Sequence, residues 1–234
     1  QGRSADVAKV LSMHKNYDMV IAPSETAGEF YCKAFGCEMD KITVASLPRV
    51  DVILNRRNRR DEFLSDNPTC KGKEIFVYLP TFRDGDADAI DSLTRAFDEL
   101  DDKVLITSAH PHSVGFRRKF NGSYSTYDLI KLSDAVITDY SASAFEASLL
   151  EKPLWFFAPD YDKYKSEQGL NTDIKEVMPH VFFTDARELT EKIKEGSYDL
   201  EKLKAFRERF VSFTGTNNTE KLANIICSFK ETAK

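Results

Sequence analysis

The sequence lacks paired cysteine motifs and long apolar runs, and each absence argues against a class of protein. Its 234 residues include four cysteines and one tryptophan. No two cysteines form a CxxC pair, and the four histidines do not follow zinc-finger spacing, so no structural zinc site is indicated. The simpler interpretation is four buried or half-buried thiols in a reducing compartment. No apolar run approaches the roughly 18 residues that a membrane-spanning helix needs.

The chain also lacks an excess of positive charge, and its balance is mildly acidic. The formal net charge is -5, whereas proteins that bind duplex nucleic acid are usually strongly basic, so no nucleic-acid partner is expected. A local basic pocket for phosphate is still compatible with this balance. The length suits one large domain or two small ones, and the hydrophobic content of 41% is enough for a sizeable core.

Short apolar runs alternate with helical patterns along most of the chain. Strands are expected at residues 18–22, 42–45, 74–79, 104–107, 135–138, 154–157 and 181–183. Helices are expected at residues 27–35, between Ser24 as N-cap and Gly36 as stop, and at 51–64, 89–100, 127–132, 143–150 and from 187 onward. Continuous apolar strands separated by helices predict an α/β fold with a Rossmann-like parallel sheet flanked by helices. Such sheets bind ligands beyond the carboxyl ends of their strands.

Polar residues follow four of the expected strands. They lie in residues 80–84, 108–112, 139–143 and 158–161. In a parallel sheet these segments meet at one edge, where they gather hydroxyls, a guanidinium, imidazoles and helix N-termini. Such a set suits a diphosphate better than a metal or a hydride carrier.

Each side chain also has a simpler interpretation. Ser141 and Ser143 stand at a helix start and act either as caps or as phosphate donors. Arg83 either forms forked bonds to phosphate or pairs with Asp84. His110 either stabilises charge on a leaving phosphate or is a turn residue before proline. Their joint placement at one edge favours the binding interpretation.

Several segments carry a resemblance in chain order. They are residues 78–84 (YLPTFRD), 136–141 (VITDYS), 152–157 (KPLWFF), 47–51 (LPRVD) and 213–217 (FTGTN). Together, over residues 17–226, the chain resembles the CDP-glycerol glycerophosphotransferase (teichoic acid polymerase) family. The resemblance implies the nucleotide-binding half of a GT-B fold. The acceptor-side domain would end within residues 1–58, with the rest of that domain outside this sequence, and the nucleotide-binding domain would occupy 59–234. The polar cluster at 67–73 would mark the joint.

The resemblance also implies a reaction. An acceptor hydroxyl attacks the polyol-side phosphorus of a CDP-polyol donor, CMP leaves, and neither a metal nor a cofactor is required. The acceptor would be a polyol-phosphate or glycan polymer of the wall or capsule. The site would lie in the cytoplasm at the inner face of the membrane, with peripheral association through the parent protein. Carried over by position, donor contacts fall at Arg49, Thr81, Arg83, Ser108, Ala109, His110, Ser141, Ala142 and Glu146, and His110 is the catalytic candidate.

This sequence departs from the family pattern at four places. It has no Trp-His-Gly segment, whose histidine would be the general base, so the chain is expected to bind donor weakly and to catalyse nothing alone. Ala142 replaces a second serine, Glu146 replaces the aspartate that contacts the polyol, and Leu47 replaces a glycine. These changes leave the polyol open between glycerol and ribitol.

Two alternative functions remain open. One is a GT-B glycosyltransferase that uses a nucleotide sugar, and the other is a non-catalytic nucleotide-binding fragment. The basic run at 56–60 is expected to be a solvated helix face paired with Asp61 and Glu62, with contact to an anionic acceptor or lipid as the alternative. The acidic run at 84–88 lacks the glycine and glutamate of a calcium loop and is attributed to a helix start.

Overall fold

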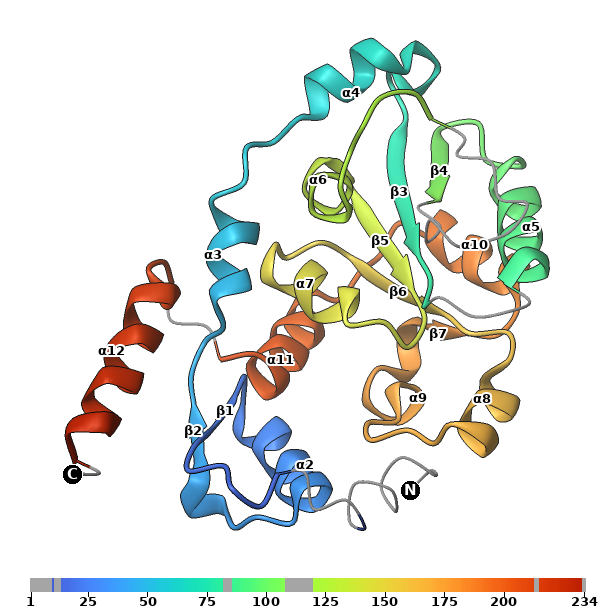
Figure 1. Ribbon diagram of the computed structural model, residues 1–234. Coiled ribbons are helices and arrows are strands. Elements are labelled where there is room, and N and C mark those ends of the chain that lie inside the picture. The colour runs from blue at the N-terminus through green and yellow to red at the C-terminus, as the bar shows by residue number, and fades with distance from the viewer. Residues whose placement is uncertain (1–9, 11–13, 82–85, 108–119, 213–214, 233–234) are drawn as a thin grey trace. The chain divides into compact units, whose positions relative to one another are not determined.

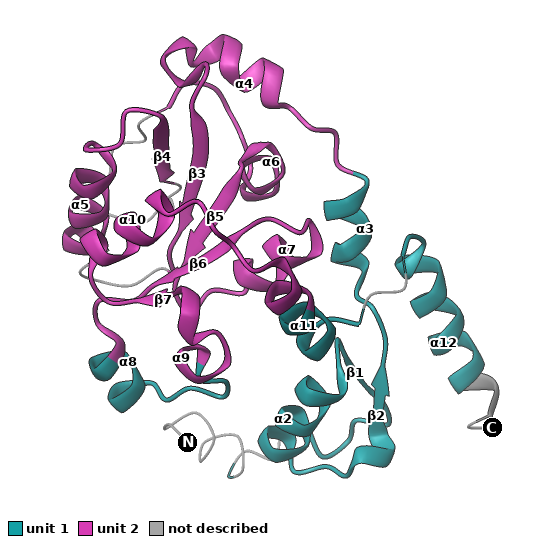
Figure 2. Ribbon diagram, turned by 180° about the vertical axis from the view of Figure 1, so that it is seen from behind, with its two compact units in different colours: residues 1–55, 162–173, 205–234 teal, residues 56–161, 174–204 magenta. Residues whose placement is uncertain are grey.

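The computed structural model describes residues 10, 14–81, 86–107, 120–212 and 215–232. The chain divides into two compact units (Figure 2). Unit 1 comprises residues 1–55, 162–173 and 205–234, and unit 2 comprises residues 56–161 and 174–204. Each unit is therefore built from more than one stretch of chain.

Unit 2 contains a five-stranded parallel sheet (Figure 1). Its strands are β3 (Glu74–Leu79), β4 (Lys103–Thr107), β5 (Ala135–Thr138), β6 (Leu154–Phe157) and β7 (Phe182–Phe183). Their order is β4-β3-β5-β6-β7, and every neighbouring pair is parallel. The register aligns Tyr78 with Thr107 and Leu79 with Thr138. The predicted Rossmann-like sheet is confirmed.

Helices cover both faces of this sheet. The helices of unit 2 are α4 (Arg60–Asp66), α5 (Asp86–Phe97), α6 (Thr126–Leu132), α7 (Ser143–Leu149), α9 (Ile174–Val177) and α10 (Ala186–Lys194), with single 3-10 turns at Pro68–Cys70 and Pro179–Val181. Helices α5 and α10 pack together on one face, and α6 and α7 pack on the strands of the other (Figure 1). The connection from β3 to β4 runs opposite to those from β4 to β5 and from β5 to β6. Right-handed crossovers therefore place their helices on opposite faces.

The central strands are buried on both faces. In β3, Ile75 and Val77 are 0% exposed, while Phe76 and Tyr78, which point the other way, are 5% and 1% exposed. This double burial explains why the strand is a continuous apolar run in the sequence. Each such side chain contributes roughly 1.5–3 kcal/mol of burial free energy.

Unit 1 contains a smaller parallel pair, β1 (Val20–Ala22) and β2 (Ile42–Val44), joined through α2 (Glu25–Phe35) and a 3-10 turn at Met39–Lys41. Ser24 caps α2 by accepting the Ala27 N–H, and Gly36 ends the helix with a left-handed φ of 67°, as predicted. In the same unit α3 (Pro48–Leu54) packs against α12 (Asn218–Thr232). The two remaining helices of the described chain are α8 (Tyr161–Glu167) and α11 (Leu200–Phe210).

The helix predicted at residues 51–64 is wrong. Two helices, α3 and α4, replace it, and the break between them coincides with the division between the units at 55/56. The Asn58 side chain accepts the Arg60 N–H at 2.9 Å and starts a new helix, while Arg56 turns to bind Asp128. Residues 67–73 lie inside unit 2, where Asn67 bonds to Asn121. The assignment of acceptor-side and nucleotide-binding domains stays a prediction.

Candidate functional site

The strand order of unit 2 places a topological switch point at β3. The chain leaves β3 towards β4 and leaves β5 towards β6, in opposite directions across the sheet. The carboxyl ends of β3 and β5 therefore border the crevice in which doubly wound sheets bind ligands. Residues 80–81 and 139–141 follow these two strands, and both segments were predicted to carry the site.

Asp139 joins the two strand ends. Its Oδ1 accepts the Thr81 N–H at 2.8 Å, the Thr81 hydroxyl at 2.7 Å and the Tyr140 N–H at 2.6 Å. One step earlier, the Thr138 hydroxyl donates to the Leu79 carbonyl at 2.7 Å. Asp139 is 1% exposed. The hydroxyl proton of Thr81 is thus committed to Asp139, so Thr81 shapes the crevice by holding the loop after β3.

The start of α7 presents a second polar group at this edge. Ala142 occupies the N-cap position and offers no side-chain cap. Ser141 acts instead, because its Oγ accepts the Ser143 N–H at 3.3 Å and lies 3.1 Å from the Ser143 Oγ. Hydroxyl rotors and first-turn N–H groups of a helix are suitable donors to an anionic oxygen.

Glu146 lies in the first turn of α7 and is 8% exposed. The hydroxyl of Tyr127, on α6, donates to its Oε1 at 3.3 Å. Two helices on the same face of the sheet therefore position this carboxylate. In the loop after β5, the Tyr140 hydroxyl donates to Asp160, in the loop after β6, at 3.3 Å. This bond connects the two loops.

Four predicted residues, Arg83, Ser108, Ala109 and His110, lie outside the described residues. The last residue of β4, Thr107, is level with Tyr78 of β3. Strand β4 therefore ends at the carboxyl edge of the sheet. Arg49 is exposed on α3 in unit 1, and its donor contact stays a prediction.

Three functional positions were missed or given no role in the sequence. Asp139 stood within a quoted segment, and an acid directly after a buried strand was its only signal. Nothing in the sequence indicated Tyr127, because its contact with Glu146 forms only when α6 and α7 pack on the same face of the sheet. Asp51 stood within the quoted segment 47–51, but nothing in the sequence indicated its partners.

Asp51 ends the resemblance segment 47–51 and binds Asn218 and Thr219, which directly follow the segment 213–217. Its carboxylate accepts the N–H groups of Asn218 at 3.0 Å and Thr219 at 2.7 Å, together with both of their side chains at 2.8 Å. These bonds, first those from the backbone of Thr219 and Asn218, hold the pKa of Asp51 well below its usual range. The carboxylate is therefore the N-terminal cap of α12, supplied by α3.

The basic run at 56–60 has mainly structural partners. Arg56 binds Asp128 with two bonds of 2.5 and 2.8 Å, and Arg60 binds Asp134 at 2.8 Å. Arg59 pairs with Glu62. Asp128 is 2% exposed; burial opposes its charge, but the bonds from Arg56 and Ser125 outweigh burial and keep its pKa low. The predicted pairing with Glu62 is present, but residues 56–59 lie in the break between α3 and α4 and form no helix face. Asp128 and Asp134 are partners that the sequence did not indicate.

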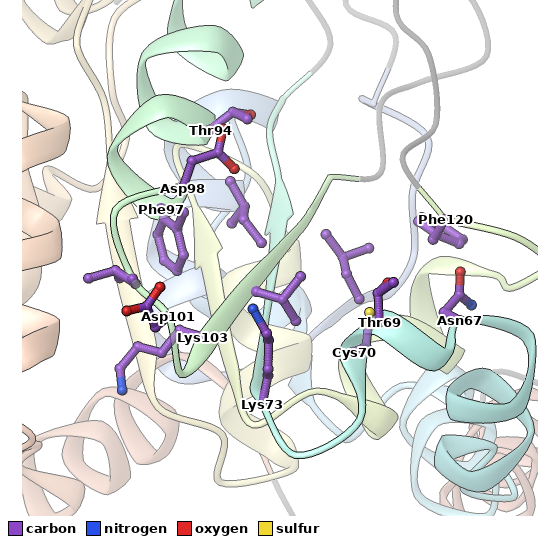
Figure 3. Close-up of a pocket in the computed structure, with 14 residues that line it drawn as sticks. Asn67, Thr69, Cys70, Lys73, Thr94, Phe97, Asp98, Asp101, Lys103 and Phe120 are labelled. Carbon is purple, nitrogen blue, oxygen red and sulfur yellow. The ribbon is translucent and has the colours of Figure 1, made fainter.

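A cavity of about 250 Å³ lies elsewhere in unit 2 (Figure 3). Lys73 precedes β3, Lys103 begins β4, and Asp98 and Asp101 follow α5. The cavity thus begins beside the amino-terminal ends of β3 and β4 and extends along β4 as far as Ile106, and none of the described residues of the candidate site lines it. It is separate from the candidate nucleotide site.

Comparison with known proteins identifies the family. The model of the CDP-Glycerol:Poly(glycerophosphate) glycerophosphotransferase family matches residues 1–228. The chain belongs to this family. A teichoic acid ribitol-phosphate primase of Bacillus spizizenii is 31% identical over 247 residues, covering 97% of this chain and 64% of the relative. A teichoic acid glycerol-phosphate primase of Bacillus subtilis is 25% identical and covers 97% and 61%.

Solved structures agree with membership of the glycerophosphotransferase family. A histidine-to-alanine variant of the wall teichoic acid polymerase TagF matches with a TM-score of 0.71 and 26% identity, covering 94% of this chain and 60% of that one. A TagF variant soaked with CDPG matches with a TM-score of 0.70 and 28% identity, covering 94% and 59%. A UDP-N-acetylglucosamine 2-epimerase from Listeria monocytogenes, at 14% identity and TM-score 0.58, shares the fold and covers 92% and 60%.

The chain thus spans about 60% of the length of these two primases and of the TagF structures. Within the described residues, no helix is both long and apolar enough to cross a membrane.

Proposed function

We propose that this chain forms the donor-binding part of a transferase that moves glycerol phosphate or ribitol phosphate from a CDP-activated donor to a wall or capsule polymer, with release of CMP. Family membership supports the reaction class. Relatives that match nearly the whole chain are named for ribitol-phosphate and for glycerol-phosphate transfer, so both polyols are candidates. The acceptor would be met at the inner face of the membrane, through the parent protein.

The observation that carries the proposal is the arrangement at the switch point. Asp139 fixes the loops after β3 and β5 against each other, and α7 begins directly beyond, with Ser141 and Ser143 at its start. The diphosphate of the donor would accept hydrogen bonds from these hydroxyls and from first-turn N–H groups of α7. The positive end of the helix dipole would offset part of its charge.

The remaining proposed donor contacts divide by chemistry. Arg83 would neutralise phosphate charge, and His110, with Ser108 and Ala109 beside it, would deliver a proton or hydrogen bond to the leaving CMP phosphate. For Arg49, on α3 of unit 1, a donor contact stays a prediction. Glu146 would accept hydrogen bonds from polyol hydroxyls while Tyr127 holds its other side. The exposed Ala142 would leave room beside it for the longer ribitol chain.

Calorimetric titration with CDP-ribitol, CDP-glycerol, UDP-glucose and CMP tests the proposal. CDP-polyols should bind more tightly than UDP-glucose, and Ser141→Ala should weaken donor binding about tenfold through the loss of one charge-assisted hydrogen bond. Ser166→Ala, on the exposed α8, is the matched control and should bind like the wild type.

Three other results would contradict the proposed function or part of it. Tighter binding of UDP-glucose than of either CDP-polyol would contradict the proposal and favour a nucleotide-sugar glycosyltransferase. Donor binding without CMP release, in the full-length parent supplied with acceptor, would favour the non-catalytic alternative. Equal affinity of wild type and Ser141→Ala would remove α7 from the site.

A further inference from the structure

Three sulfur atoms converge at the end of α2 in unit 1. The Sγ atoms of Cys32 and Cys37 are 4.0 Å apart, and the Cys32 Sγ is 3.5 Å from the Sδ of Met39. Both cysteines are unoxidised and half-buried, so solutes can reach them. The proposed transfer reaction uses none of these three side chains.

The way α2 ends explains why the two thiols meet. Gly36 adopts the left-handed conformation, and the N–H groups of Gly36 and Cys37 both donate to the Cys32 carbonyl, at 2.8 and 3.3 Å. In this type of helix ending the residue after the glycine folds back over the last full turn, where apolar side chains usually touch. Here the two side chains in those places are cysteines.

Met39 is held over the same helix face. Gly28 precedes Cys32 by four residues, so the two lie one above the other on α2. A Cβ built on Gly28 would lie 3.6 Å from the Cε of Met39. The methionine side chain therefore lies along this face, with its methyl group beside Gly28 and its sulfur beside Cys32, although the residue is 45% exposed.

The charges beside this cluster favour a bound cation. Glu38 and Asp40 both act electrostatically on the Cys32 thiol. A cation that replaces the thiol protons would be attracted by these two carboxylates.

We propose that Cys32, Cys37 and Met39 form a binding site for copper(I). Thiolate and thioether ligands together select this soft monovalent ion. Metal–sulfur bonds of about 2.3 Å hold three ligands of a trigonal plane about 4 Å apart, close to the sulfur separations seen here. Among the described residues no three His, Cys, Asp or Glu side chains group together, so a hard-metal site has no comparable ligand set. The bound ion would link the end of α2 to the turn at Met39–Lys41.

Competition under anaerobic conditions tests the site. The reduced full chain should take one equivalent of copper(I) from a chromogenic copper(I) chelator and release thiol protons to the buffer. Cys32→Ser and Cys37→Ser should each lower the affinity roughly 100-fold, and Met39→Leu, which keeps the size of the side chain, about tenfold. Cys227→Ser, at the exposed cysteine of α12, is the matched control and should bind like the wild type.

Thermal unfolding provides a second measurement that does not depend on enzymatic activity. Copper(I) should raise the Tm of the wild type and of Cys227→Ser but not that of Cys37→Ser. Unchanged affinity in both Cys32→Ser and Cys37→Ser would overturn the proposal. So would a wild type that binds no copper(I) and instead closes a Cys32–Cys37 disulfide on treatment with peroxide. Equal affinity of Met39→Leu and wild type would remove the thioether from the site.

Discussion

Asp128 shows how one buried carboxylate organises the chain around it. The residue is 2% exposed and receives bonds from Arg56, from Arg59 and from both the N–H and the hydroxyl of Ser125. Ser125 and Asp128 also form the capping box that starts α6. One side chain therefore starts a helix and anchors the segment that leads into α4.

We predict that Asp128→Asn lowers the free energy of unfolding by about 3 kcal/mol, because Arg56 loses a buried partner. Urea denaturation measures the change. Glu62→Gln is the control and should change the free energy of unfolding little. The Glu62 side chain is 43% exposed, and its partner Arg59 also donates to the Ser123 carbonyl. The native pKa of Asp128 lies below its unfolded value, so its contribution is present above the ordinary aspartate pKa and is lost as the pH falls towards the native value. The two proteins should converge in stability in acid.

At the scale of elements, α12 depends on a cap from another helix. The carboxylate of Asp51, on α3, takes the place of a local N-cap at Asn218 and Thr219. We predict that Asp51→Asn speeds amide hydrogen exchange in the first turn of α12, because an amide oxygen cannot accept all four bonds. Asp61→Asn, on α4, should leave this exchange unchanged. The lowered pKa of Asp51 implies that acid should lower the protection of these amides, measured against the intrinsic exchange rate at each pH, and bring the wild type towards the variant. Identical exchange at neutral pH would show that the carboxylate does not hold α12.

Strand β6 has an analogous support from a side chain. The Tyr198 hydroxyl donates to the Leu154 carbonyl at 3.1 Å and accepts its N–H at 3.0 Å. We predict that Tyr198→Phe costs about 1–2 kcal/mol of stability in chemical denaturation, because both backbone groups lose their partner. Tyr31→Phe on α2 is the control.

Alkaline titration checks the same contact independently. Burial raises the pKa of Tyr198 to about 12. The stabilisation it provides is complete below the ordinary tyrosine pKa near 10 and is lost as the pH rises through the native value. Wild type should therefore lose more stability than Tyr198→Phe above pH of about 10. Parallel pH profiles would contradict this role.

For the molecule as a whole, the sequence predicts local order and strand burial well, and long-range pairing poorly. Strands β3, β5 and β6 were predicted with their observed bounds, because burial on both faces makes each a continuous apolar run. The break between α3 and α4 was missed, because it depends on Arg56 reaching Asp128, which is 72 residues away. The cap of α12 depends on a pairing across 167 residues.

The candidate site shows the same division. Strand ends can be recognised in the sequence, and parallel strands bring them to one edge, so the location at the carboxyl ends of β3 and β5 was predictable. The part played by Asp139 was not, because it follows from the register that sets Leu79 beside Thr138. The two loops can hydrogen-bond to each other only when the ends of β3 and β5 lie side by side. No spacing in the sequence encodes this register.

We predict that the donor protects backbone amides at one end of the unit 2 sheet from hydrogen exchange. If the donor binds at the switch point, saturating CDP-ribitol or CDP-glycerol should slow amide exchange most in residues 79–81 and 139–146 of unit 2. The start of β4 at Lys103, where the cavity begins, should show no change, because it lies at the other end of the strands. Hydrogen-exchange mass spectrometry resolves the two ends, and Thr81→Val, which removes the hydroxyl bond to Asp139, should reduce the protection of both loops together. Protection confined to the cavity end would place the nucleotide there and contradict the switch-point site, since a ligand slows exchange where it orders the backbone it contacts.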